Sequence, residues 1–82
     1  MRLPRNLSGE DLAAALRTLG YTITRQTGSH MRLTTLVRGE HHITIPKHSS
    51  LRAGTLSRIL LEIERHHGLS RSHLISTLFG SD

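Results

Sequence analysis

Apolar residues recur at helical spacing near the start of the chain, at Leu12, Leu16 and Leu19. Three consecutive alanines within this stretch are strong helix formers. Ser8 stands where an N-cap is expected, with an acidic residue three positions later, and Leu7 forms a hydrophobic staple with Leu12. The pattern predicts a first helix that begins after Ser8 and ends at Gly20, a residue type common at helix C-termini.

After this helix the pattern changes to a repeat of two residues, which is typical of half-buried strands. In the first such segment, Tyr21 and Ile23 share one face. Two further segments, His30 to Val37 and His41 to Pro46, continue the alternation and are joined by short glycine-containing turns, so three antiparallel strands are expected. Their apolar positions, which we expect to face the core, are Met31, Leu33, Val37, Ile43 and Ile45. The polar positions on the opposite face are His30, Arg32, Thr34, His42 and Thr44.

Apolar residues return to helical spacing after a basic loop from Lys47 to Ala53, at Leu56, Ile59, Leu60 and Ile63. This second helix is expected to end at Gly68, and Ser70 can cap a third helix that carries Leu74, Ile75, Leu78 and Phe79. The order is α-β-β-β-α-α, without an internal repeat or linker. We therefore expect one domain over residues 1–82 with an α+β fold, in which the helices pack on one face of a three-stranded antiparallel sheet around a two-layer core.

The charge of the chain indicates an anionic partner. Its 82 residues include 11 basic and 6 acidic side chains, which gives a formal charge of +5. Ten of the basic residues are arginines, which suit bidentate contacts with phosphate. Nucleic acid or an acidic protein is the expected class of partner. The only aromatic residues are Tyr21 and Phe79, which argues against a protein that stacks successive bases on aromatic side chains.

The absence of cysteine excludes a disulfide framework, a thiolate metal site and a cysteine nucleophile. It also fits a reducing cytoplasm. Near the N-terminus Leu3 is followed by Pro4 and not by an apolar stretch, so we expect neither a signal peptide nor a transmembrane helix. The expected location is cytoplasmic, without membrane association.

His30 is the strongest catalytic candidate among the seven histidines. It follows a glycine-containing turn on the polar face of a strand, where a rigid sheet would hold it open to a polymeric substrate. An imidazole that titrates near neutral pH can accept the proton of a ribose 2′-hydroxyl, and the alkoxide can then attack the adjacent phosphate without a metal or other cofactor. The residues alone also leave open that His30 is a polar strand residue without a catalytic role.

His48, after the third strand, is the best candidate for a second acid or base, or else a loop histidine that binds phosphate or caps the next helix. Arg52 stands just before a helix N-terminus, where a cation opposes the helix dipole. Its position is explained if an anion binds between it and the backbone amides of Gly54 and Thr55. The basic residues nearest in sequence for stabilising a charged phosphorane are Arg25, Arg32, Lys47 and Arg52.

A metal site is the main rival, since four histidines lie close in sequence: His30, His41, His42 and His48. Adjacent His41 and His42 are expected on opposite faces of a strand, and neither a His-x₃-His motif nor a carboxylate pair lies nearby, so we expect no metal site. A serine hydrolase would need a Gly-x-Ser-x-Gly elbow, which the chain lacks. His66 and His67 fall in the last turn of the second helix, where they suit the helix dipole, and we expect no catalytic role for them.

A series of short motifs, in matching order and spacing, resembles the HicA toxin family. The motifs are Gly20-Tyr21, Arg25-Gln26-Thr27-Gly28-Ser29-His30, Ile45-Pro46-Lys47-His48, Gly54-Thr55-Leu56 and Ile59-Leu60. The resemblance covers about residues 9 to 79. The chain departs from the family pattern in one place, where a few additional residues lengthen the second helix before His66.

The resemblance implies a double-stranded-RNA-binding-like α-β-β-β-α fold, here with an additional C-terminal helix. It also implies endoribonuclease activity on messenger RNA and a cognate HicB-like antitoxin that blocks it. In that family the histidine of the Gly-Ser-His motif is catalytic, and that position here is His30. The residues that we assign to RNA binding are Arg25, Gly28, Ser29, Arg32, Lys47, Arg52, Gly54 and Thr55.

Alternative functions remain beside a metal-independent ribonuclease toxin. The chain would otherwise be a double-stranded-RNA-binding module that does not cut, an inactive toxin homologue, or a basic adaptor for an acidic protein. The role of His30 discriminates between them, because only a nuclease needs a histidine at the turn. We expect a monomer alone and a hetero-oligomer with the antitoxin.

Overall fold

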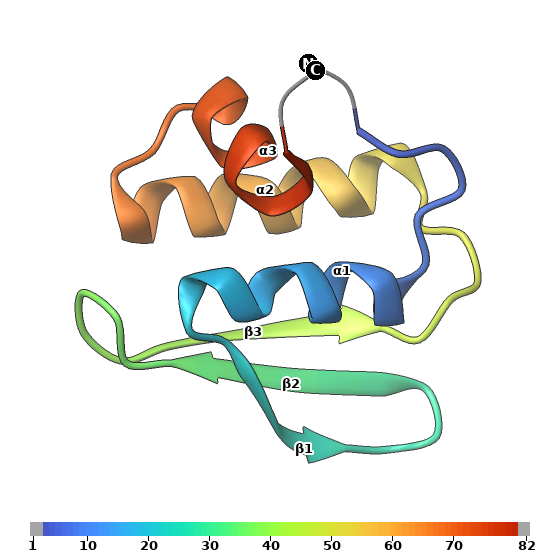
Figure 1. Ribbon diagram of the computed structural model, residues 1–82. Coiled ribbons are helices and arrows are strands. Elements are labelled where there is room, and N and C mark those ends of the chain that lie inside the picture. Colours follow the sequence, from blue (N-terminus) through green and yellow to red (C-terminus); the bar gives the residue numbers. More distant parts are fainter. Residues whose placement is uncertain (1–2, 81–82) are drawn as a thin grey trace.

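The computed structural model describes residues 3–80 and has the element order expected from the sequence. Its elements are helix α1 (Gly9–Ala15), the 3₁₀ helix η1 (Leu16–Leu19), strands β1 (Thr22–Gln26), β2 (His30–Thr35) and β3 (His41–Pro46), and helices α2 (Ala53–His67) and α3 (Arg71–Phe79). The double-stranded-RNA-binding-like α-β-β-β-α order with an additional C-terminal helix is therefore confirmed (Figure 1). Within residues 3–80, no helix has the length and apolar character needed to cross a membrane.

The helices begin and end at the predicted capping residues. Ser8 Oγ accepts a hydrogen bond of 2.9 Å from the backbone N–H of Asp11, and Ser70 caps α3 in the same way. Gly20 follows η1 and Gly68 follows α2, each with a positive φ that favours glycine. The first helix departs from a uniform α-helix, because its last four residues tighten into η1.

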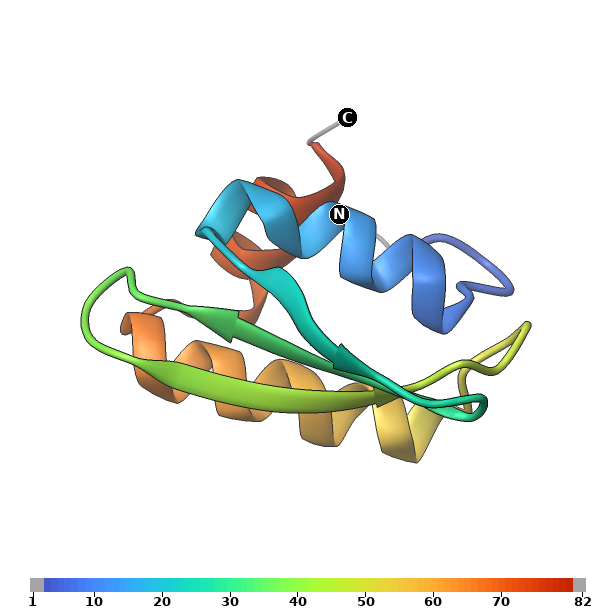
Figure 2. The same cartoon turned by 90° about the horizontal axis from the view of Figure 1, so that it is seen from below.

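One face of the sheet is covered by helices and the other face is uncovered. The strands pair antiparallel in the order β1-β2-β3. Helices α1 and α2 lie over the same face, and the view from below in Figure 2 shows the opposite face without a helix on it. Burial alternates accordingly, and the inward side chains of β2 and β3 include Met31, Leu33, Ile43 and Ile45. The predicted one-sided packing of the helices is confirmed.

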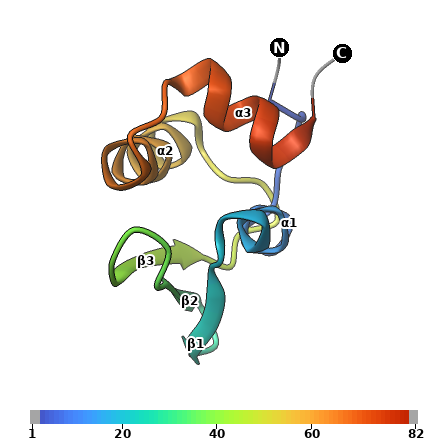
Figure 3. The same cartoon turned by 60° about the vertical axis from the view of Figure 1, so that its left-hand side comes forward.

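Helix α3 adds a layer that the sequence did not reveal. It packs against α2 and η1, and Figure 3 shows it on the side of the helices away from the sheet. Leu74 is fully buried in this packing and Leu78 nearly so. The expected core shared by sheet and helices is confirmed, because Leu74 and Leu78 belong to the same hydrophobic cluster as the inward residues of the strands. Helix α3 extends the expected two layers on the side away from the sheet.

Two apolar side chains of the strand region are about half exposed. Ile23 is 48% exposed because β1 is an edge strand that the helices leave largely uncovered. Val37 is 47% exposed because β2 ends at Thr35. The Thr35 hydroxyl takes the last inward position of the strand, where it donates a hydrogen bond of 2.8 Å to the carbonyl of Leu19 and accepts one from the N–H of Val37. A polar side chain thus ends the alternation that the apolar pattern extended to Val37.

Candidate active site

A compact turn between β1 and β2 positions His30. The N–H of Thr27 donates to the carbonyl of His30 over 2.9 Å. The Thr27 hydroxyl oxygen accepts hydrogen bonds from the N–H groups of Ser29, at 3.3 Å, and His30, at 3.1 Å. Threonine side chains commonly brace turns in this way. The first residue of β2 is therefore held by the turn as well as by the sheet.

The imidazole of His30 is exposed, and one of its nitrogens is engaged. Nδ1 lies 2.8 Å from the Ser29 hydroxyl oxygen. Within residues 3–80, Nε2 has no hydrogen-bond partner. When Nδ1 carries the proton and donates it to Ser29, Nε2 presents a lone pair to solvent, which is the form that a general base requires.

The loop that follows β3 is attached to this turn. The N–H of Lys47 donates to the carbonyl of Ser29 over 2.8 Å, and Lys47 Nζ lies 3.5 Å from the carbonyl oxygen of Thr27. One residue further on, the carbonyl of His48 accepts a hydrogen bond of 2.9 Å from the N–H of Gly9 in α1. The first bond fixes the backbone of Lys47 beside the turn, and the bond of His48 attaches the loop to α1. The side chain of His48 is exposed, and no hydrogen bond within residues 3–80 joins it to His30.

The N-terminus of α2 lies at the same end of the molecule. Figure 1 shows the β1–β2 turn, the β3–α2 loop and the first turns of α1 and α2 together at one end. Arg52 is the N-cap residue of α2, and its side chain makes no capping hydrogen bond. The first turn of α2 has no acidic residue, and Gly54 is open to solvent. This arrangement keeps the first N–H groups of α2 available for the anion expected beside Arg52, Gly54 and Thr55.

The predicted RNA-binding residues fall into two groups. Gly28, Ser29, Lys47, Arg52, Gly54 and Thr55 lie at the end of the molecule just described. Arg25 and Arg32 instead lie on the uncovered face of the sheet, where they are cross-strand partners. His30 shares that face with Arg32, because side chains two residues apart in a strand point the same way.

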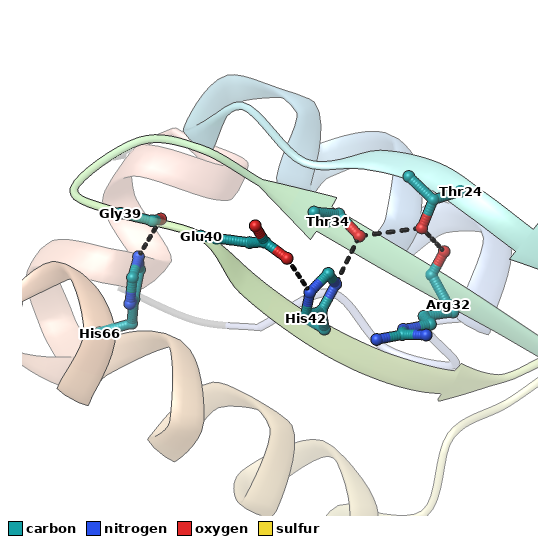
Figure 4. A network of polar contacts seen from close by, with 7 residues as sticks. All are labelled: Thr24, Arg32, Thr34, Gly39, Glu40, His42 and His66. Atoms are coloured by element: carbon teal, nitrogen blue, oxygen red, sulfur yellow. Dashed lines mark hydrogen bonds and ion pairs between the residues drawn. The ribbon is translucent and has the colours of Figure 1, made fainter.

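A chain of polar side chains on the uncovered face was not identified from the sequence (Figure 4). Thr24 Oγ1 lies 2.9 Å from Thr34 Oγ1, which lies 2.7 Å from His42 Nδ1. His42 Nε2 lies 2.6 Å from a carboxylate oxygen of Glu40. Because a carboxylate only accepts, His42 donates to Glu40 through Nε2 and, when neutral, accepts from Thr34 through Nδ1. The network fixes the orientation of the His42 ring, and the Glu40 carboxylate serves as the partner of His42 Nε2.

A groove between α1 and β1 lies on the other side of the sheet from His30. It has a volume of about 300 Å³, and its lining includes Ala13, Arg17, Ile23 and Met31 but none of the predicted catalytic or RNA-binding residues. The candidate site is therefore an open surface and not this groove, as suits a polymeric substrate.

Three other histidines form a cluster with the buried Tyr21. Its hydroxyl lies 2.7 Å from His41 Nδ1 and 3.1 Å from His67 Nε2. The rings of His41 and His66 stack with centroids 4.4 Å apart, and His66 Nε2 lies 2.9 Å from the carbonyl oxygen of Val37. This cluster joins α2 to the start of β1, to β3 and to the β2–β3 loop. His66 and His67 therefore have packing roles beyond the expected interaction with the helix dipole.

Burial sets the protonation of this cluster. It raises the pKa of the Tyr21 hydroxyl to about 12, with a further contribution from Glu62, so the hydroxyl stays protonated at neutral pH. Burial also lowers the pKa of His41, and nearby His66 and His42 add to the effect while Glu62 opposes it. The pKa of His67 is lowered by burial and then by His66, His41 and Arg38. Tyr21 therefore donates to one neutral imidazole and accepts from the other.

We expect the fold to lose stability in mild acid. Because the pKa values of His41 and His67 lie below the ordinary 6.5, the unfolded chain binds protons more readily than the folded chain does. The free energy of unfolding is thus highest above pH 6.5 and decreases as the pH falls below it, by at most about 1.4 kcal/mol per pH unit for each group. Urea unfolding between pH 8 and pH 5, at roughly half-unit steps, measures this slope.

The contribution of the cluster is isolated by two matched variants. His67→Gln keeps a hydrogen-bonding group near Tyr21 but does not titrate, so its acid sensitivity should be smaller than that of the original chain. His73→Gln changes an exposed histidine of α3 and should leave the slope unchanged. Equal slopes in the two variants would show that His67 does not contribute.

Comparison with known proteins found a match to one protein family. No curated protein and no solved structure matches the chain. A family model described as the HicA toxin of bacterial toxin–antitoxin systems matches residues 9–69, which include α1, the sheet, the His30 turn and α2. Because this match spans well over half of the 82 residues, the chain belongs to the HicA family of toxins of bacterial toxin–antitoxin systems.

Proposed function

We propose that this toxin is a metal-independent endoribonuclease that cleaves messenger RNA with His30 as its general base. The observation that carries the proposal is the state of the His30 ring. The Thr27 turn and the Ser29 hydroxyl fix it on one side, and its Nε2 is exposed on the other. Basic side chains surround an otherwise open surface, which suits an extended anionic polymer.

The proposed reaction uses an oxygen of the RNA as the nucleophile. His30 Nε2 accepts the proton of a ribose 2′-hydroxyl, and the 2′-oxygen attacks the adjacent phosphorus. The bond from phosphorus to the 5′-oxygen breaks, and this oxygen takes a proton from a general acid. His48 is the proposed acid, since it follows Lys47, whose backbone N–H is hydrogen bonded to the turn. The products of this step are a 2′,3′-cyclic phosphate and a 5′-hydroxyl. In a second step His48 takes a proton from water, the water oxygen attacks phosphorus, and protonated His30 gives its proton to the departing 2′-oxygen, which leaves a 3′-phosphate.

The negative charge that develops on the phosphorane oxygens is stabilised best by hydrogen-bond donors held in fixed positions. The side chain of Lys47 contacts the turn, because its Nζ lies 3.5 Å from the carbonyl oxygen of Thr27. Arg52 and the N–H groups of Gly54 and Thr55 at the start of α2 offer a second anion site at the same end of the molecule. We propose that these groups stabilise the phosphorane while Gly28 and Ser29 let the RNA backbone approach the turn.

We expect cleavage to continue in excess chelator and to require the 2′-hydroxyl. Within residues 3–80, no group of three histidine or carboxylate side chains is placed to hold a metal ion, and the proposed nucleophile belongs to the RNA itself. The measurement is the rate of cleavage of an RNA oligonucleotide with and without chelator, with mass analysis of the product ends. The matched control is the same oligonucleotide with deoxyribose at the scissile position, which should resist.

The outcomes separate the candidate functions. Cyclic phosphate and 5′-hydroxyl ends support the proposal, whereas cleavage of the deoxy substrate at an equal rate would exclude it. RNA binding without cleavage would indicate the non-catalytic binding module instead.

We also propose that the partner of this toxin is an acidic, HicB-like antitoxin that covers the basic surface around His30. The charge that attracts phosphate also attracts carboxylates, so the antitoxin and RNA would compete for the same residues.

A further inference from the structure

We propose that the uncovered face of the sheet binds one flank of the RNA, with Arg25 and Arg32 holding the phosphate next to the one that is cleaved. This inference rests on the proposed function for the identity of the polymer. It also predicts the path of the RNA, which would run from the His30 turn across the strands of the sheet and not only past the N-terminus of α2. The same face offers the hydroxyls of Thr24 and Thr34 beyond the two arginines.

A β-bulge brings Arg25 onto this face. β1 pairs with β2 through Ile23 and Leu33, and the register then shifts so that Arg25 is the partner of Arg32. Without the shift Arg25 would pair with Met31, which points into the core. Thr24 is the extra residue, and its hydroxyl bonds to the Arg32 carbonyl and to Thr34. Bulges often redirect a side chain next to a functional site, and this one makes two arginines cross-strand partners on the uncovered face.

The pair is unfavourable for the isolated protein. Like charges directly opposite each other in a sheet are destabilising. Neither arginine takes part in the ion pairs of residues 3–80, which join Glu40 to His42, Glu62 to Arg58 and Glu64 to Arg71. The other acidic residues within this range, Glu10 and Asp11, lie in α1 on the covered side. An anion between the arginines would remove the repulsion.

The position of the pair matches the spacing of a nucleic-acid backbone. His30 and Arg32 are two residues apart on one strand face, which separates them by about 7 Å. Successive phosphates of an extended strand have a similar separation, so a phosphate attacked at His30 places its neighbour near the arginine pair. Two arginines bind a phosphate through several parallel hydrogen bonds. The described part of this face carries no Phe, Tyr or Trp side chain, so we expect it to bind mainly the RNA backbone.

The test measures RNA affinity as a function of salt in the His30→Ala background, so that the RNA is not cut. The probe is a fluorescent single-stranded RNA oligonucleotide of mixed sequence. R25Q/R32Q should bind more weakly, and its slope of log affinity against log salt should be shallower by about 0.7, the contribution of one phosphate contact on a single strand. The control R58Q/R65Q removes the same charge from exposed positions of α2 and should keep the slope.

Two further measurements show whether a weaker RNA affinity comes from lost contacts or from unfolding of the variant. R25K/R32K keeps both charges but loses the bidentate geometry, so it should bind more weakly with an unchanged slope. The unfolding temperature of R25Q/R32Q should rise, because the repulsion is relieved. A slope and affinity in R25Q/R32Q equal to those of R58Q/R65Q would overturn the inference. So would a larger loss of polyglutamate binding than of RNA binding, which would assign the face to an acidic protein.

Failure of the inference is distinguishable from failure of the proposed function. If the original chain does not cleave RNA but R25Q/R32Q still lowers RNA affinity and slope, the face binds RNA and the catalytic proposal is wrong. If the original chain cleaves RNA and the arginine variants bind as the control does, the catalytic proposal stands and the RNA takes another path.

Discussion

Replacing His30 with alanine is expected to lower the rate of RNA cleavage by about 10²- to 10⁴-fold, the usual contribution of a general acid or base. The imidazole is proposed to remove the 2′-proton, and within residues 3–80 the only side chain hydrogen bonded to this ring is that of Ser29. The stability of the fold should change by less than about 0.5 kcal/mol, because the side chain is exposed. Expression of the variant should accordingly no longer arrest growth.

The matched control for this substitution is His73→Ala. His73 is also exposed, but it lies on α3, which packs on the far side of the helices from the sheet. This variant should cleave RNA at the original rate, as measured with the same oligonucleotide. If a folded His30→Ala variant retained full activity, His30 would not be the base, and the catalytic role would pass to another group.

The substitution Gly9→Ala is expected to destabilise the protein by about 1–3 kcal/mol, the range found when atoms are forced into a packed interior. A Cβ at this position would lie 2.0 Å from the carbonyl oxygen of Pro46, at the end of β3. Hydrogen bonds hold the backbone at this contact in place, since the N–H of Gly9 donates to the carbonyl of His48. The first turn of α1 and the end of β3 must therefore move apart.

The same substitution at Gly54 is expected to have the opposite sign. Gly54 also lies in the first turn of a helix, but a Cβ there would meet no atom within 4 Å. Gly54→Ala should therefore stabilise the chain by about 0.4–1 kcal/mol, since alanine restricts the unfolded chain. Urea unfolding of both variants gives the comparison. If Gly9→Ala left the free energy of unfolding unchanged, α1 could move away from the end of β3 without cost, and the expected clash with Pro46 would be wrong.

Local signals in the sequence predicted most of the elements. Ser8, Ser70, Gly20 and Gly68 act on neighbouring backbone groups, so their effect on helix ends is visible in a short stretch of sequence. The bounds of β3 and the inward positions of β2 as far as Leu33 follow from simple alternation. The exposure of Ile23 could not be predicted this way, because it depends on how far the helices extend over an edge strand.

The candidate site was predicted in part for a similar reason. The position of His30 after a turn and on the polar face follows from alternation in β2, and the resemblance of Gly28-Ser29-His30 to the family motif led to the same prediction. Alternation from Tyr21 would have put Arg25 with the core residues, and only the register shift reveals its pairing with Arg32. The cluster around Tyr21 joins residues as far apart as 46 positions, so neither His41 nor His67 showed a partner in its own neighbourhood.

The irregular pairing of β1 also limits what the free edge of the sheet can do. Open edges present unpaired N–H and C=O groups that can recruit a strand from another molecule and begin aggregation. β1 has only five residues, is interrupted by a bulge and carries the charge of Arg25 near its end. A second copy therefore finds no long regular ladder to extend, although the hydrophobic side chain of Ile23 is half exposed there. This edge is therefore a poor template for polymerisation.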